Sequence, residues 1–121
     1  MKVYISHPYG GKRANLEHVE ELIVGLYKKY PSLKAHSYLN SPVCMVSPIH
    51  ALGFLYDEVD YDMGMKLCYA LIDGCDFLVY REGEISEGVK RELAYCERNN
   101  IPIVEWKDFE TLLAIRNGAM T

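Results

Sequence analysis

The chain has 121 residues, of which half are apolar and a quarter are charged. This is the size and composition of one ordinary globular domain, so we expect a single domain over residues 1–121 and exclude a disordered tail, a collagen-like repeat and a multidomain enzyme. The net charge is −4 and the basic residues are scattered. That distribution argues against a nucleic-acid polymer as partner, although it leaves a single nucleotide open.

The sequence contains no recognisable membrane or targeting segment. No run of about 18 apolar residues occurs, and Met1 leads through a short apolar stretch directly into the polar pair Ser6 and His7. We therefore expect no membrane partner and a cytoplasmic location.

The cysteines are not spaced as metal ligands. They form neither a C-x-x-C pair nor a Cys/His ligand ladder, and they are Cys44, Cys68, Cys75 and Cys96. We predict reduced, mostly buried thiols rather than a zinc site.

The first third of the chain predicts a strand and a helix. Residues 2–5 are apolar and β-branched or aromatic, and a run of turn formers follows them to Gly11. From about residue 13 to 30, apolar residues recur at three- and four-residue spacing, which indicates one buried helical face. Asn15 is the candidate N-cap of this helix, and Pro31 is its expected end.

The middle of the chain is less regular. Residues 32–40 are polar and irregular, and residues 42–48 look like a second buried strand closed by proline. Residues 49–57 are apolar and aromatic without a clean period, so we expect a packed or intersubunit loop there.

The second half returns to regular alternation of helices and strands. The expected elements are a helix over 59–74 ended by Gly74, a strand over 76–80, a helix over 86–99, a strand over 101–104 and a helix from the cap Asp108 to about 117.

Alternating short apolar strands and helices predict an α/β fold with a doubly wound, Rossmann- or flavodoxin-like parallel sheet. We expect four to five strands with helices on both faces. In such sheets the ligand lies beyond the carboxyl ends of the strands, near the point where the strand order reverses. The loops 6–11 and 81–88 are therefore the candidate site.

The helix that follows the second of these loops begins with Ser86, a good N-cap, and Gly88 removes a side chain from its first turn. The free N–H groups of that turn favour an anion. Glu92, further along, has no charged neighbour on its own helical face. It is either a solvated surface glutamate or a carboxylate that faces a pocket as nucleophile or base.

The first loop is equally open to two interpretations. Gly10 and Gly11 ahead of a helix can bring backbone N–H groups close to a phosphate, yet the pattern matches no phosphate-binding fingerprint and also fits an ordinary turn. Tyr9 in the same loop can stack on a base or simply pack.

Four motifs together give a resemblance that covers about residues 2–105. They are VYISHPYGG at 3–11 with Asn15 downstream, CDFL at 75–78, S-x-G-x-x-x-E-x-x-x-C at 86–96 and IPI at 101–103. The chain resembles the nucleoside 2-deoxyribosyltransferase superfamily, in particular its short bacterial and viral members of unassigned function. It is more distantly similar to the 2′-deoxynucleoside 5′-phosphate N-hydrolases.

The resemblance implies a nucleophilic carboxylate at Glu92, which would attack the anomeric carbon of a nucleoside or nucleotide with no metal and no organic cofactor. It also implies sugar or phosphate contacts from the first loop and from the start of the glutamate helix. The matching residues are Ser6, His7, Gly10, Gly11, Ser86 and Gly88.

Family enzymes also carry an acidic residue near the start of the preceding helix, which serves the sugar and the departing base. Asp60 and Asp62 are both candidates here, and neither aligns without an insertion. Both also fit an acidic first turn that complements the helix dipole.

Several other polar residues are weaker candidates. His50 fits a structural histidine as well as a ligand, and Asp76 at a strand start is expected to bind backbone N–H groups. Tyr4 alternates with the core-facing residues of its strand. His18 and His36 carry no functional signal.

Two functions remain open from the sequence: an enzyme that cleaves or transfers at the N-glycosidic bond, and a nucleotide-binding or nucleotide-sensing module that has lost catalysis. A purely structural protein is a weaker third. The apolar segment 47–65 is more than one sheet edge can hide, so we also expect a homodimer or homotetramer.

Overall fold

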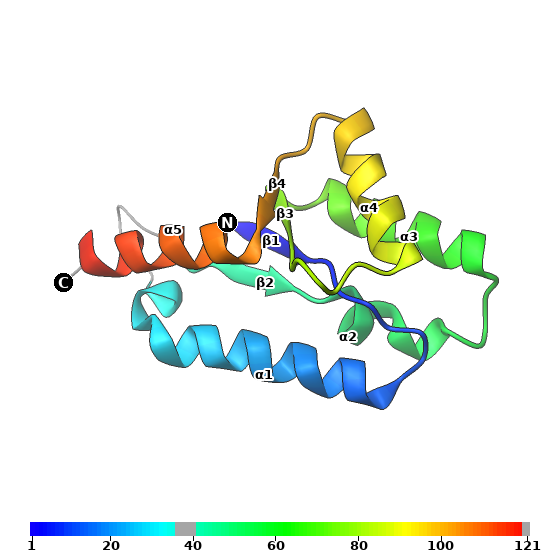
Figure 1. Ribbon diagram of the computed structural model, residues 1–121, viewed down its shortest axis with the longest axis horizontal. Helices are drawn as coiled ribbons and strands as arrows, with labels where there is room; N and C mark the ends of the chain where they lie inside the picture. Colours follow the sequence, from blue (N-terminus) through cyan, green and yellow to red (C-terminus); the bar gives the residue numbers. More distant parts are fainter. Residues whose placement is uncertain (36–40, 120–121) are drawn as a thin grey trace.

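The computed structural model describes residues 1–35 and 41–119, and it is an α/β structure with an all-parallel sheet (Figure 1). The four strands are β1 (Lys2–Ile5), β2 (Cys44–Val46), β3 (Phe77–Tyr80) and β4 (Ile103–Glu105), in the order β2-β1-β3-β4. The predicted doubly wound fold is confirmed, with four strands in the described part of the chain.

Helices cover both faces of this sheet (Figure 1). The long helices are α1 (Arg13–Lys29), α3 (Tyr61–Asp73), α4 (Glu87–Arg98) and α5 (Trp106–Ala119). Helices α1 and α5 pack on one face, and α3 and α4 pack on the other. The described residues contain no helix with the length and apolar character that crossing a membrane requires.

The alternation of side chains along β1 divides the core into two layers. Val3 and Ile5 point to the α1 and α5 side, where they pack with Leu26 and Phe109. Tyr4, between them, points to the α3 and α4 side and is fully buried there. The same face of the sheet therefore receives Tyr4 and the helix that carries the candidate nucleophile.

The expectation of a loop over 49–57 is wrong. It contains the short helix α2 (Pro48–Leu52) and the 3-10 turn η2 (Gly53–Leu55). Ser47 caps α2, since its hydroxyl accepts from the backbone N–H of His50 at 3.4 Å. Proline at the first helical position after a serine is a start signal, but one turn is too short to show periodicity.

Two of the expected helix caps are also wrong. Asn15 lies inside α1, where its side-chain amide donates to the carbonyl of Tyr9 at 2.9 Å and so fixes the preceding loop. Asp108 lies inside α5, which begins at Trp106. The expected caps Ser86 of α4 and Gly74 of α3 are confirmed.

The irregular stretch expected over 32–40 is only partly described. The 3-10 turn η1 (Pro31–Lys34) follows α1, and residues 36–40, which include His36, lie outside the described residues. All four cysteine thiols are free, but the expectation that they are mostly buried is wrong, because Cys96 is buried, Cys68 and Cys75 are half-buried and Cys44 is exposed.

Candidate functional site

The sheet reverses its direction of growth between β1 and β3. From β1 the chain continues to β2 on one side, and from β3 it continues to β4 on the other. This is the position at which doubly wound proteins bind ligands. The loop after β1 is tied to β3 there, because the backbone N–H of Ser6 donates to the carbonyl of Val79 at 2.8 Å.

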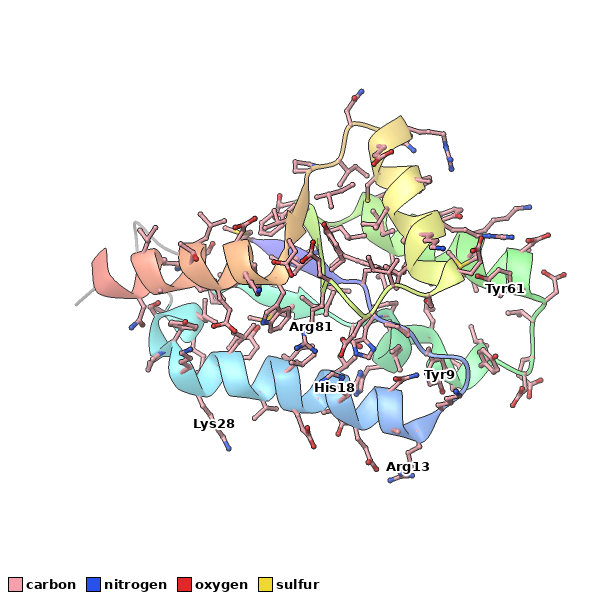
Figure 2. The ribbon with its side chains drawn as sticks, in the orientation of Figure 1. Tyr9, Arg13, His18, Lys28, Tyr61 and Arg81 are labelled. Atoms are coloured by element: carbon pink, nitrogen blue, oxygen red, sulfur yellow. The ribbon has the colours of Figure 1, made fainter. Side chains whose placement is uncertain are left out.

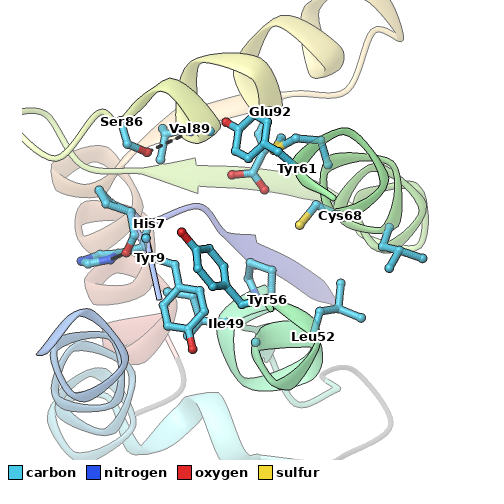
Figure 3. Close-up of a pocket in the computed structure, with 18 of the residues that line it drawn as sticks. His7, Tyr9, Ile49, Leu52, Tyr56, Tyr61, Cys68, Ser86, Val89 and Glu92 are labelled. Carbon is cyan, nitrogen blue, oxygen red and sulfur yellow. Dashed lines mark hydrogen bonds between the residues drawn. The ribbon is translucent and has the colours of Figure 1, made fainter. Parts of the chain in front are cut away.

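A pocket of about 620 Å³ opens at this point (Figure 3). Its lining comes from the loop after β1, from α2 and η2, from the first half of α3 and from the first two turns of α4. A volume of this size accommodates a drug-sized or nucleotide-sized ligand.

Glu92 is a buried carboxyl group in the lining of this pocket. Figure 3 shows its side chain reaching from α4 into the pocket, although the residue is only 5 % exposed. The hydroxyl of Tyr4 donates to one carboxyl oxygen, and the hydroxyl of Ser6 donates to the other at 2.9 Å. No ion pair with Glu92 occurs among the described residues.

Burial raises the pKa of Glu92 to about 7, and the hydrogen bonds from Tyr4 and Ser6 act in the opposite direction. Burial, and then the neighbouring Glu92, raise the pKa of Tyr4 well above its ordinary value, so its hydroxyl keeps the proton it donates. Burial also raises the pKa of Cys68 in the same lining to about 11, which leaves a thiol rather than a thiolate. Glu92 is thus a group of this pocket that changes charge near neutral pH.

The predicted contact residues of α4 lie at the entrance to the same pocket. Ser86 and Gly88 both line it, and the Ser86 hydroxyl caps the helix by accepting from the N–H of Val89 at 3.3 Å. A Cβ at Gly88 would fit, in ordinary van der Waals contact with the Tyr61 hydroxyl at 3.5 Å and with Ser86 and Met65. The remaining free N–H groups of that turn suit an anion.

The backbone conformation of the first loop explains why it contains two glycines. Gly10 and Gly11 have φ of +60° and +70°, and a Cβ at Gly11 would lie 2.7 Å from the ring of Tyr56. Gly10 lines the pocket, whereas Gly11 is not among its lining residues. Tyr9 lies edge-on to Tyr56, with the ring centroids 5.4 Å apart. Two aromatic rings next to apolar residues of α2 suit a planar heterocycle.

The two candidate acids are placed differently. Asp60 lines the pocket and caps α3, where its carboxylate accepts from the backbone N–H of Met63 at 2.7 Å. Asp62 is exposed, is not among the residues that line the pocket, and pairs with Arg91 at 3.2 Å.

His7 belongs to the pocket lining, but its ring is held by other groups. Its nitrogens contact the carbonyl of Pro8 at 2.8 Å, His18 at 3.0 Å and Glu84 at 3.0 Å. Burial lowers the pKa of His7 more strongly than the bond to Pro8 and the nearby Glu84 raise it. Arg81 completes this group by donating to Glu84 at 2.9 Å.

Sequence reasoning missed Tyr4, His18, Arg81 and Glu84 as parts of this region. From the sequence, Tyr4 looks like a core residue. His18, Arg81 and Glu84 lie on segments that are distant in sequence and that only the fold brings together. A buried carboxylate without a charged neighbour on its own helix needs hydrogen-bond donors from other segments. This requirement was the signal that could have pointed to the hydroxyl of Tyr4.

Two further candidates have structural roles. His50 is held by the hydroxyl of Ser47 at 2.7 Å and by Glu20 at 2.9 Å. Asp76 accepts from the backbone N–H of Lys2 at 2.7 Å, as expected for a residue at a strand start.

Comparison of the sequence with models of known protein families gives no match, and comparison with curated proteins gives none either. What the pocket can do must therefore be derived from its own residues.

Proposed function

We propose that the protein cleaves or transfers at the N-glycosidic bond of a nucleoside or (deoxy)nucleoside 5′-monophosphate, with Glu92 as the nucleophile. The observation that carries this proposal is the carboxyl group of Glu92, buried at the switch point of the sheet, aimed into a pocket and held by the hydroxyls of Tyr4 and Ser6. The resemblance of its helix to that of the nucleoside 2-deoxyribosyltransferase superfamily supports the same assignment.

The two hydroxyls prepare the carboxylate for attack. Each donates to a different oxygen, which fixes the plane of the carboxylate and stabilises its ionised form. The raised pKa makes the ionised group a stronger nucleophile than an exposed glutamate, while about half of it is ionised near neutrality.

The reaction has two steps. A Glu92 oxygen forms a bond to the anomeric carbon as the bond from that carbon to the base nitrogen breaks, and the electron pair leaves with the base. Water or a second base then attacks the same carbon and releases Glu92. Neither step calls for a metal or an organic cofactor.

The departing base must gain a proton. Asp60 lines the pocket and Asp62 does not, so the geometry favours Asp60 as the group that serves the base. Its bond to the N–H of Met63 leaves the carboxyl group at the edge of the pocket.

The lining of the pocket has features that suit both the phosphate and the base of a nucleotide. Ser86, Gly88 and Gly10 lie where backbone N–H groups favour a phosphate. Tyr9 and Tyr56 lie among apolar residues, where a base would be enclosed.

One observation favours a second function, a nucleotide-binding or nucleotide-sensing module without catalysis. A carboxyl with a pKa of about 7 is largely protonated on the acidic side of neutrality. In that form it donates a hydrogen bond to a ligand instead of attacking it. The pocket would then recognise the same ligands and leave them intact.

Incubation with a panel of nucleosides and 5′-monophosphates, followed by chromatography for free base, tests the proposal. We expect base release from at least one compound, and Glu92→Gln should reduce the rate by several powers of ten because the amide is not a nucleophile. The same variant should still bind the substrate in a thermal-shift assay.

Glu97→Gln is the matched control, because Glu97 is exposed on the same helix. Binding without base release would assign the protein to the non-catalytic module. Equal base release by Glu92→Gln and the parent would refute the nucleophile, and a panel that neither binds nor reacts would leave only a structural role.

A further inference from the structure

Beside the pocket, three side chains from separate parts of the chain direct polar atoms at one another. His7 lies in the loop after β1, His18 lies on α1, and Glu84 lies in the loop after β3. His7 Nε2 is 3.0 Å from His18 Nδ1 and 3.0 Å from Glu84 Oε2, and His18 Nδ1 is 3.4 Å from Glu84 Oε1. Figure 2 shows His18 reaching from α1 toward Arg81, which lies at the same cluster.

The hydrogen bond to Pro8 fixes the tautomer of His7. The Pro8 carbonyl only accepts, so His7 Nδ1 carries the proton that it donates there at 2.8 Å. In the neutral ring Nε2 is then a bare lone pair, and it faces the cluster.

The proton of His18 follows from Arg81 in the same way. Arg81 only donates, and its Nη1 lies 3.2 Å from His18 Nε2, so that nitrogen accepts and Nδ1 carries the proton. This proton is directed at His7 or at Glu84 and can satisfy one of them.

Arg81 serves Glu84 Oε1 and His18 Nε2, but the space between His7 Nε2, His18 Nδ1 and Glu84 Oε2 holds more lone pairs than protons. Glu84 Oε2 is buried without a hydrogen-bond partner among the described residues, although His7 Nε2 lies 3.0 Å away. Two acceptors that face each other repel unless a cation lies between them. A proton on His7 would serve Glu84 but would set two N–H groups 3.0 Å apart on the two histidines.

We propose that His7 Nε2, His18 Nδ1 and Glu84 bind a divalent transition-metal ion of the zinc class. The ligand atoms lie within 4.8 Å of one another. His7 Nε2 lies 3.0 Å from His18 Nδ1 and 3.0 Å from Glu84 Oε2, which is near the roughly 3.3 Å edge of a tetrahedral zinc site. The bond from His7 Nδ1 to the Pro8 carbonyl is the outer contact that metal-binding histidines commonly make. Three protein ligands leave a fourth position for water or a ligand atom.

The positive charge of Arg81 disfavours a metal ion at this site, so a variant at Arg81 gives a specific test of the proposal. When His18 Nδ1 binds the ion, its proton moves to Nε2, and Arg81 must release that nitrogen. Its contact with Glu84 Oε1 at 2.9 Å and its position over the ring of Trp106 are compatible with this change. Removing the positive charge should therefore strengthen metal binding.

The bound ion would join the loop after β1 to the loop after β3. Both loops lead into the pocket, through Pro8 to Gly10 on one side and through Ser86 on the other. The ion would hold these two loops of the pocket lining in place and takes no part in the reaction proposed for Glu92. The inference therefore stands independently of the proposed function.

The test is calorimetric titration of the chelator-treated protein with Zn²⁺, repeated with Co²⁺ while the visible absorption of tetrahedral Co²⁺ is recorded. We expect one ion per chain with micromolar or tighter affinity. His18→Ala and Glu84→Gln should each weaken binding at least about tenfold, whereas Arg81→Gln should tighten it.

His50→Ala and Cys44→Ser are the controls, because they remove a histidine paired with Glu20 and an exposed thiol elsewhere on the surface. Both should bind Zn²⁺ as the parent does. The absence of saturable binding at micromolar Zn²⁺, unchanged affinity in His18→Ala, or weaker binding in Arg81→Gln would each overturn the proposal. So would a parent chain that binds no metal and shows a doubly protonated His7 ring by NMR.

Discussion

Glu92 combines two properties that rarely coexist in a side chain with a purely structural role. It is buried, which disfavours its charge, and it accepts two hydroxyl hydrogen bonds, which favour the same charge. The balance places its pKa at about 7. A fold that needed only packing at this position would be better served by an apolar side chain, so the carboxyl is retained at a cost in stability.

This cost predicts a pH dependence of stability. The folded pKa is raised from 4.5 to about 7, so between these values the folded chain holds a proton that the unfolded chain has lost. The contribution is fully present below about pH 4.5 and is lost as the pH rises through 7, by roughly 3 kcal/mol. Glu92→Gln cannot ionise and should lack this fall.

Urea unfolding at pH 5 and pH 8 measures the effect. The difference in unfolding free energy between Glu92→Gln and the parent should shift in favour of the variant by up to roughly 3 kcal/mol from pH 5 to pH 8. Glu97→Gln on the exposed side of the helix should follow the parent. A parallel pH dependence of parent and Glu92→Gln would show that the carboxyl ionises alike in the folded and unfolded chains.

At the scale of the element, the first turn of α4 decides what the pocket can hold. Ser86, Glu87 and Gly88 of this turn line the pocket, and Gly88 contributes no side chain to it. We therefore expect 5′-monophosphates to bind more tightly than the corresponding nucleosides.

Gly88→Ala tests this expectation without disturbing the fold. Its methyl would meet no atom closer than 3.5 Å, and alanine is the better helix former by about 1 kcal/mol, so the melting temperature should hold or rise. If a phosphate binds at this turn as proposed, the methyl would crowd it, and the preference for nucleotides over nucleosides should fall about tenfold.

Gly25→Ala is the matched control, because Gly25 lies within α1 with open space around its Cβ position and outside the pocket lining. It should gain stability in the same way and leave both affinities unchanged. If calorimetry shows that a nucleoside binds the parent as tightly as its monophosphate, the pocket does not recognise the phosphate and this prediction is wrong.

The elements that the sequence predicted best are those with a repeating pattern or a strong end signal. Helices α1, α3 and α4 show apolar periodicity, and Ser86 and Gly74 mark ends that the structure confirms. The α2 turn was missed because one turn has no period. Asn15 looked like a cap because an amide next to a helix start is ambiguous, and here the side chain bonds backward to the loop.

The site was predictable in outline and not in its partners. The rule for parallel sheets placed the loops after β1 and β3 together. The choice of Ser6, Gly10 and Glu92 as site residues came from the family resemblance. The hydroxyl of Tyr4 and the cluster of His18 with Glu84 depend on side-chain directions across three segments. No local pattern carries that information.

At the scale of the whole molecule, the segment from α2 into α3 leaves large apolar side chains in solvent. Phe54 is 76 % exposed, and Tyr56, Tyr61 and Met63 are each exposed by more than two fifths. Ile49 and Met65, at the ends of the same segment, are buried. Tyr56 and Tyr61 line the pocket, whereas Phe54 and Met63 do not. The segment thus supplies pocket wall through the two tyrosines and leaves an uncovered apolar surface at Phe54 and Met63.

Uncovered apolar surface of this kind normally marks an interface, and two-fold closure is the commonest arrangement for a soluble homo-oligomer. We predict a homodimer, or a dimer of dimers, in which this segment lies between subunits and completes each pocket. Light scattering at micromolar concentration should give a mass of at least twice that of the chain.

Phe54→Asp combined with Met63→Asp should yield monomers, because neither charge can be buried unpaired. Since neither side chain lines the pocket, loss of ligand binding in these monomers would mean that the partner subunit completes the site. Ile115→Asp, an equally exposed apolar position on α5, should change neither assembly nor binding. A parent chain that scatters as a monomer would contradict the interface, and monomeric variants that still bind nucleotide would place the whole pocket within one chain.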